Sequence, residues 1–330
     1  MKWIITLSAC LLGVLYVCNG QINKNHMTKQ TNNPLLCDVE TGMCEVPDTN
    51  ATIGNLHTAA TEKPVKVIYY TDPICSSCWG IEPQLRRLKL EYGHTVEIAC
   101  HMGGLLPDWS YNSGGISKPS DVAHHWDEVS AYYDMPIDGD VWLEDPLPSS
   151  YPPSIAFKAA TLQDEAKAIK FLRVLREMVF LQKKNITKWE HIAAAAEKVG
   201  LNVAQLKTDY EGRGKELFEA DLAQGRSLGV RGFPTMIFSN GAGQREVVYG
   251  SKPYGAYEAA IAKLYPQRKA SSYSKNWKDL FTIYPTLTAR EYAELSGTPR
   301  AAAEKALQAL EQQGHLNRLT TKNGSLWMLK

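Results

Sequence analysis

Hydrophobic and polar positions along the chain first predict a strand, a helix and a second strand. The run "PVKVIYYTDP" (64–73) is rich in β-branched and aromatic residues and ends at Asp-Pro, which is typical of a buried strand. Apolar residues at helical spacing follow over 78–93, with Gly93 placed to end the helix and Pro83 expected to kink it. The run 94–102 then predicts the second strand.

The pattern between residues 118 and 228 is mostly helical, and strands return after it. Apolar residues recur at helical spacing over 120–133, 153–162, 164–184, 187–200 and 214–229. The runs 230–239 and 245–250 predict two strands joined by an Asn-Gly turn at 240–243, which is a strong hairpin signal. A helix over 253–265 completes this part of the chain.

Composition and charge place the chain among ordinary globular proteins. Its 330 residues are 44% hydrophobic and 22% charged, and the formal net charge is +1. No overall field therefore attracts nucleic acid or an acidic surface. No apolar run reaches the roughly 18 residues that a membrane span needs. We therefore expect that nucleic acid is not a partner of this protein. We also expect no membrane span once residues 1–20 have been removed.

The N-terminus differs from the rest of the chain. Residues 1–20 carry one lysine and then an apolar stretch with small residues before Gln21, as an export signal does. Residues 21–63 form a polar lead-in. Removal of the signal would place the protein in the periplasm or cell envelope. A translation start at Met27 would instead leave it in the cytoplasm.

A shift in composition near residue 268 predicts a second, smaller domain over 269–330. Its order of helix, tight turn, helix and hairpin is typical of a winged helix. From Ser271 onward it has eight basic and five acidic side chains, whereas DNA-binding domains usually carry a denser basic face. We therefore expect this domain to contact protein rather than DNA.

The stretch "DPICSSCWG" places Cys75 and Cys78 one turn apart, where the first strand gives way to the helix. Backbone N–H groups and the helix dipole favour a thiolate there, so we expect a lowered pKa at Cys75 and attack by its sulfur. Cys78 would then resolve the mixed disulfide. The alternatives are half of a zinc site, for which a second pair of ligands is not evident, and two inert buried thiols.

A second motif, "GVRGFPT" (229–235), precedes the later strand. Together the two motifs resemble the DsbA-type branch of the thioredoxin fold, over roughly residues 64–265. The runs "DPICSSCWGIEPQL", "MGGLLPDW" and "YPPSIAFKAA" bring the chain nearer to the FrnE-like members and the SpxH (YjbH) protease-adaptor group. The resemblance implies an α/β fold over 64–268, a thioredoxin fold with a DsbA-type helical insertion at about 110–228. The winged-helix-like domain would follow it.

The resemblance also implies further site residues. Pro234 would be a cis proline beside the dithiol, and Phe233 would offer its backbone to a substrate strand. Gly103 falls in the family's loop next to the dithiol. Gly232 and Trp79 lie within the two motifs, and we expect these two residues and Gly103 to bind substrate.

The chain departs from the family where a proton acceptor is expected. Tyr69 stands six positions before Cys75, where related proteins often carry an acidic residue. Asp72 and Glu82 are the nearby candidates for that role, although an exposed or capping carboxylate is the better interpretation of both. No histidine lies between the two cysteines, so we also expect a less extreme redox potential than that of strongly oxidising relatives.

Other candidate residues have simpler explanations. Cys37 and Cys44 are close enough in "CDVETGMC" for a structural disulfide or a secondary redox pair if the protein is exported. Cys100 is expected to be a small buried side chain. His124 and Glu128 form an i, i+4 pair that indicates a solvated helix face rather than a metal site. We expect no metal or organic cofactor, because a dithiol itself carries two electrons.

These observations lead to two hypotheses on function. The first is a thiol–disulfide oxidoreductase that acts on protein or small-molecule thiols, with Cys75, Cys78 and Pro234 as its catalytic residues. The second is a redox-sensitive adaptor that presents a client protein to a protease or regulator. The first predicts that Cys75→Ser abolishes turnover, and the second predicts that client binding survives this change.

Overall fold

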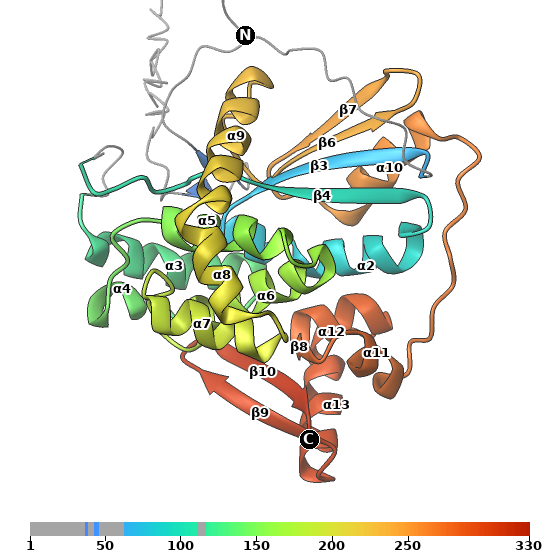
Figure 1. Ribbon diagram of the computed structural model, residues 1–330. Coiled ribbons are helices and arrows are strands. Elements are labelled where there is room, and N and C mark those ends of the chain that lie inside the picture. The colour runs from blue at the N-terminus through green and yellow to red at the C-terminus, as the bar shows by residue number, and fades with distance from the viewer. Residues whose placement is uncertain (1–36, 39–42, 46–62, 111–116) are drawn as a thin grey trace, which may run out of the picture. The chain divides into compact units, whose positions relative to one another are not determined.

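A mixed β-sheet forms the centre of the fold. The computed structural model describes residues 63–110 and 117–330, and the backbone alone of 37–38 and 43–45. Within these residues the sheet has the strand order β4-β3-β6-β7, in which β3 runs parallel to β4 and antiparallel to β6 (Figure 1). Its strands are β3 Val65–Thr71, β4 Val96–Met102, β6 Thr235–Asn240 and β7 Arg245–Tyr249.

Alternating side chains of β3 enter two different cores. Val67 and Tyr69 pack with helices α2 (Glu82–Tyr92) and α10 (Tyr254–Leu264) on one face of the sheet. Tyr70 belongs to the larger core, which the helical insertion builds on the other face. This period of two is why β3 is apolar along almost its whole length.

The predicted kinked helix is two helices. Helix α1 (Ser76–Gly80) ends at Ile81, and α2 begins at the next residue. Pro83 lies at the start of α2, where its missing N–H leaves no helical hydrogen bond unmade.

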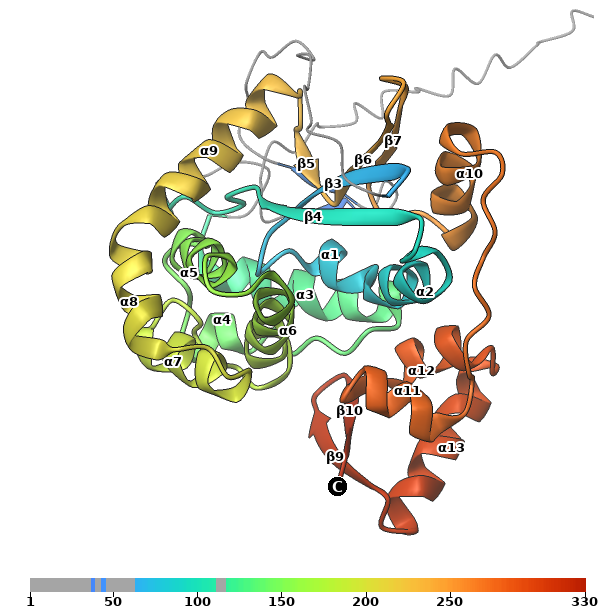
Figure 2. The ribbon, with the colours of Figure 1, turned by 45° about the vertical axis from the view of Figure 1, so that its right-hand side comes forward.

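A block of helices lies between β4 and β5 (Gly232–Phe233), in the position predicted for the insertion. Figure 2 shows α3, α4, α5, α6 and α7 on the same side of β4 as α1, whereas α9 rises past β4 towards β5. They are α3 Pro119–Tyr133, α4 Val141–Glu144, α5 Tyr151–Thr161, α6 Glu165–Leu181, α7 Trp189–Lys198, α8 Val203–Glu211 and α9 Arg213–Ser227. Helices α4 and α8 are additions to the predicted elements.

The C-terminal region (residues 269–330) has its own apolar core, with Leu280, Leu307 and Trp327 fully buried. Its sheet has the strand order β8-β10-β9, and α12 packs against α2. Its elements are α11 Trp277–Ile283, β8 Thr286–Thr288, α12 Ala289–Ser296, α13 Arg300–Gln312, β9 Leu316–Thr321 and β10 Gly324–Leu329. The predicted helix–helix–hairpin order is present, with α11 and β8 added, and the winged-helix classification stays a prediction.

Two short strands precede this fold. Strand β1 (Cys37–Asp38) pairs antiparallel with β2 (Met43–Glu45), and β2 pairs antiparallel with β5. The predicted leader at 1–20 and the start at Met27 lie outside the described residues. None of the helices within the described residues combines the length and the hydrophobicity of a membrane span.

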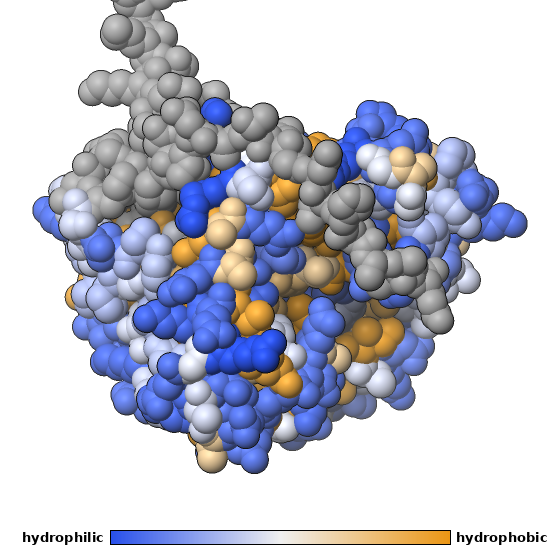
Figure 3. Space-filling model, turned by 45° about the horizontal axis from the view of Figure 1, so that its top comes forward, coloured by the Kyte–Doolittle hydropathy of each residue, from blue (hydrophilic) through white to orange (hydrophobic). Residues whose placement is uncertain are grey.

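Strand β7 is an edge of the sheet, and Val247 and Tyr249 are exposed on it. Figure 3 brings the upper side of Figure 1 forward and shows hydrophobic residues gathered between hydrophilic ones on this side. Exposed apolar side chains along a sheet edge are a feature of surfaces that pair with another chain.

Candidate functional site

The dithiol lies at the junction between β3 and α1, as predicted. Cys75 is the N-cap of α1, and its Sγ accepts a hydrogen bond of 3.2 Å from the backbone N–H of Cys78. The structure holds both residues as thiols rather than as a disulfide. Both side chains are 0% exposed. A partner molecule therefore cannot reach either sulfur without movement of the surrounding chain.

The pKa values of the two thiols are shifted in opposite directions. It raises the pKa of Cys75 well above its ordinary value, so the expected lowering at Cys75 is wrong. Burial also acts to raise the pKa of Cys78, but the hydrogen bond from Cys75 and the positive charge of Arg176 outweigh it and lower that pKa.

Arg176 lies close to the dithiol, and its positive charge acts on Cys78. It was not among the predicted site residues. It comes from α6 and is almost fully buried. Its Nη1 donates to Glu82 Oε1 at 2.6 Å, and its Nη2 donates to Thr71 Oγ1 at 2.5 Å. Thr71 Oγ1 in turn donates to the Tyr69 hydroxyl at 3.2 Å. A tyrosine and an arginine therefore occupy the place where an acidic proton acceptor was sought.

Asp72 is fully buried beside the dithiol and the N-cap of α1 is Cys75, so the expectation of an exposed or helix-capping carboxylate is wrong. Its oxygens accept hydrogen bonds from the backbone N–H groups of Ile74 (3.0 Å) and Leu105 (2.8 Å) and from Ser150 Oγ (2.9 Å). Burial outweighs these bonds and raises the pKa of Asp72 to about 6. Its full set of partners gives Asp72 a structural role in joining β3 to the loop after β4.

Glu82 is the other carboxylate near the dithiol. Burial acts to raise its pKa, but the charges of Arg176, Arg173 and Arg86 outweigh burial and lower it. Glu82 is therefore ionised and paired, and it does not have the raised pKa that a proton acceptor for Cys78 would need.

The loop before β6 contains the predicted proline motif. The Phe233–Pro234 peptide bond is cis. Phe233 is buried in the same apolar core as Cys75 and Cys78. Gly103 is required beside it, because a Cβ atom at position 103 would lie 1.7 Å from Phe233 Cζ. Gly103 therefore positions Phe233.

Two other predicted substrate-binding residues have different surroundings. Trp79 is 0% exposed, donates from Nε1 to the Pro136 carbonyl at 3.0 Å, and stacks on Phe180. It belongs to the core between α1 and the helical insertion, which argues against contact with substrate. Gly232 lies in β5 and pairs with Glu45 of β2. The chain itself thus occupies the strand edge that was predicted for a substrate.

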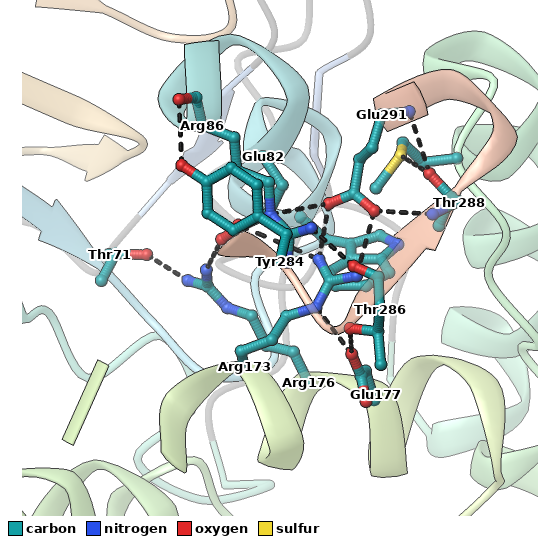
Figure 4. A network of polar contacts seen from close by, with 12 residues as sticks. Thr71, Glu82, Arg86, Arg173, Arg176, Glu177, Tyr284, Thr286, Thr288 and Glu291 are labelled. Carbon is teal, nitrogen blue, oxygen red and sulfur yellow. Dashed lines mark hydrogen bonds and ion pairs between the residues drawn. The ribbon is translucent and has the colours of Figure 1, made fainter. Parts of the chain in front are cut away.

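A buried network of charged side chains connects Arg176, which lies next to the dithiol, with the C-terminal region (Figure 4). Glu291, at the start of α12, is fully buried and accepts two hydrogen bonds from Arg173, at 2.7 and 3.0 Å. Its Oε1 also lies 3.2 Å from Arg86 Nε. Arg173 and Arg176 both pair with Glu82, at 3.9 and 2.6 Å. Ion pairs therefore connect Arg176, which lies next to the dithiol, with Glu291 of α12.

A cavity of about 680 Å³ lies beside this network. Its walls come from β3, β4, α2, α6, the end of α7 and the run from the end of α11 to β8. Apolar side chains such as Ile98 and Ile169 line it together with Lys89 and Lys170.

Of the remaining candidates, His124, Glu128 and Cys100 lie in the described part of the chain. His124 Nε2 lies 3.2 Å from Glu128 Oε1 on an exposed helix face, as predicted. No cluster with metal-ligating composition occurs among the described residues. Cys100 is half-buried, and burial raises the pKa of its thiol. The side chains of Cys37 and Cys44 lie outside the described part of the structure.

Comparison with known proteins places the chain in a family. It matches the family model described as thioredoxin over residues 69–259, more than half of its length, and therefore belongs to the thioredoxin family. The chain is 32% identical over 308 residues to the ClpXP adapter protein SpxH of Halalkalibacterium halodurans, covering 92% of this chain and 98% of that protein. The chain thus belongs, within the thioredoxin family, to the family of the SpxH proteins. The ClpXP adapter protein SpxH of Bacillus subtilis (strain 168) is 26% identical over 271 residues, covering 81% and 89%.

Solved structures agree on the fold. A putative protein disulfide isomerase from Nitrosomonas europaea superposes with a TM-score of 0.55 at 20% identity, covering 63% of this chain and 100% of that one. The cytosolic disulfide reductase DsbM from Pseudomonas aeruginosa gives 0.50 at 20% identity, covering 60% and 98%. At this identity the likeness concerns the DsbA-like thioredoxin fold alone.

Proposed function

We propose that this protein is an adapter that delivers a client protein to a ClpXP-type protease, and that its buried dithiol makes delivery sensitive to oxidation. The observation that carries the proposal is the extent of the match. The two relatives named ClpXP adapter align with 92% and 81% of the chain, whereas the disulfide isomerase and reductase structures align with 63% and 60% of it. The adapter family thus also accounts for the C-terminal region.

The geometry of the dithiol supports the adapter hypothesis over the oxidoreductase hypothesis. A turnover enzyme needs its attacking sulfur accessible and acidic. Cys75 is instead fully buried with a raised pKa, and β2 is paired along β5. Such a dithiol suits a switch that reacts seldom. Oxidation would join Cys78 to Cys75 in a disulfide, change the packing next to Arg176 and thereby disturb the network that reaches α12.

A thiol–disulfide oxidoreductase remains the second candidate. It is supported by the dithiol at a helix N-terminus and by the cis Phe233–Pro234 bond in the same core. On that hypothesis Cys75 attacks, Cys78 resolves, and the substrates are protein or small-molecule thiols. The location of the protein in the cell separates the two hypotheses. An adapter works beside its protease, so the adapter hypothesis favours the cytoplasmic start at Met27 over export.

Complementation of a deletion strain tests the proposal. Cells that lack the gene receive the wild-type chain, the Cys75→Ser/Cys78→Ser double variant, or Cys100→Ser as the matched control. Protein half-lives are then measured after synthesis is blocked. The adapter proposal predicts a set of proteins whose lifetimes lengthen both in the deletion and in cells without ClpX. It also predicts that all three chains restore the short lifetimes.

The oxidoreductase hypothesis gives a different pattern in the same strains. The double variant would fail to restore the wild-type state, and the difference would appear as altered thiol oxidation of cellular proteins rather than as altered lifetimes. If no lifetime depends on both this chain and ClpX, the adapter proposal is wrong.

A further inference from the structure

The hairpin of β1 and β2 carries two cysteines that the function proposed above does not use. Cys44 is the register partner of Phe233, and Cys37 is the register partner of Cys44. Strand β2 also contacts helix α1, which begins directly after Cys75. The backbone thus brings Cys44 to the edge of the loop whose Phe233 shares a core with the dithiol.

The same register places Cys37 and Cys44 within reach of each other. Residues directly opposite in an antiparallel pair have Cα atoms about 4.5–5.5 Å apart. Disulfides form across Cα separations of about 4.4–6.8 Å. The backbone of the hairpin is therefore compatible with both the dithiol and the disulfide form of this pair.

The buried dithiol lacks a direct route for an oxidant. Cys75 and Cys78 are both 0% exposed, and in thiol–disulfide exchange the attacking sulfur must meet the disulfide directly. The position along β5 where an external strand would bring a disulfide is taken by β2. A disulfide that includes Cys44 of β2 would lie beside β5 and could meet the attacking sulfur directly.

We propose that the β1–β2 hairpin is an internal redox partner that passes oxidation to the dithiol through a Cys44–Cys75 mixed disulfide. A low-molecular-weight disulfide such as oxidised glutathione first converts the Cys37 and Cys44 thiols to a disulfide and leaves as two thiols. This inference rests on the proposed redox sensitivity of the dithiol. It does not require that the client be delivered to a protease.

The exchange that follows is balanced within the chain. The Cys75 thiolate attacks Cys44 Sγ, the Cys44–Cys75 bond forms, the Cys37–Cys44 bond breaks, and Cys37 leaves and takes up the proton that Cys75 released. The Cys78 thiolate then attacks Cys75 Sγ and displaces Cys44, which takes up the proton from Cys78. Two electrons and two protons thereby move from the Cys75–Cys78 dithiol to the hairpin.

Two matched double variants of the full chain test the pairing. Cys37→Ser/Cys78→Ser keeps Cys44 with Cys75, and Cys44→Ser/Cys78→Ser keeps Cys37 with Cys75. Each is reduced, exposed to oxidised glutathione, alkylated and digested with trypsin. A disulfide to Cys75 joins the peptides 30–66 and 67–86 and is identified by mass. We expect the Cys44–Cys75 product to exceed the Cys37–Cys75 product by about tenfold or more, as an intramolecular neighbour should. Equal yields, or glutathione adducts alone, would overturn the proposal.

A second measurement keeps the test independent of these variants. Oxidised glutathione is added to the reduced wild-type chain, to Cys37→Ser/Cys44→Ser and to the control Cys100→Ser, and formation of the Cys75–Cys78 disulfide is followed over time. We expect the hairpin variant to be slower by about tenfold or more and the control to match the wild type. Equal rates in all three chains would show that oxidation does not pass through the hairpin. Client lifetimes in the complemented strain report on the adapter proposal separately.

Discussion

Glu291 provides the sharpest test of the buried network. Its carboxylate is fully buried and accepts two hydrogen bonds from Arg173 and an ion pair from Arg86. Glu291→Gln keeps the shape of the side chain and removes its charge. The amide oxygen can still accept the 2.8 Å hydrogen bond from the Thr288 backbone N–H, so the helix cap is retained. The change therefore isolates the loss of charge opposite two buried guanidinium groups.

The size of the effect follows from burial. Removal of one partner from a buried ion pair costs about 3–5 kcal/mol, and retention of the cap places Glu291→Gln near 3 kcal/mol. Glu294→Gln is the matched control on the same helix, because Glu294 pairs with Arg87 and Arg290, which are each about one third exposed. Pairs of that kind are worth about 1 kcal/mol or less.

Urea unfolding, followed by tryptophan fluorescence, measures both free energies. The reasoning predicts a clearly larger loss for Glu291→Gln than for Glu294→Gln. Equal losses would show that the network contributes no more than a surface ion pair, and that α12 is held to α2 by apolar packing alone.

Three further predictions concern the dithiol and its surroundings. Arg176→Met should raise the pKa of Cys78, which shifts the ultraviolet absorbance of the thiolate to higher pH; an unchanged titration would contradict the role given to Arg176. Asp72 has a folded pKa of about 6 against 3.8 unfolded, so stability should fall by up to about 3 kcal/mol as the pH rises from about 4 to about 6. Asp72→Asn should remove this fall in pH-dependent unfolding, and an identical pH profile would exclude Asp72 as its source. Gly103→Ala forces a Cβ against the Phe233 ring and should cost about 1–3 kcal/mol in the same unfolding experiment; a change within error would mean that Phe233 moves freely.

The parts of the site that local sequence specifies could be predicted. An apolar strand that ends at Asp-Pro and leads into a helix places Cys75 at the helix N-terminus whatever the rest of the chain does. The Phe-Pro motif before a strand likewise indicated Pro234, through resemblance to a family. Helical periodicity was sufficient to place the insertion between β4 and β5, although it missed the short helix α4 and the weakly amphipathic α8.

The electrostatics of the site could not be predicted, because they depend on which side chains the fold buries. Arg176 lies on an amphipathic helix where any arginine would be taken for a surface residue, yet it is almost fully buried beside Thr71. Asp72 follows a strand as a turn residue does, and it is covered by the loop after β4 and by Ser150 at the start of α5. The acidity expected for Cys75 was wrong because burial outweighs the helix N-terminus.

Reconstituted degradation tests the adapter proposal most directly. Purified ClpX and ClpP with ATP are combined with a protein whose lifetime in cells depends on both this chain and ClpX. The rate of degradation is measured with and without the purified chain, and with its Cys75→Ser/Cys78→Ser variant. The proposal predicts that the wild-type chain and the variant accelerate degradation alike under reducing conditions. Degradation that proceeds at the same rate with and without the chain would contradict the proposal.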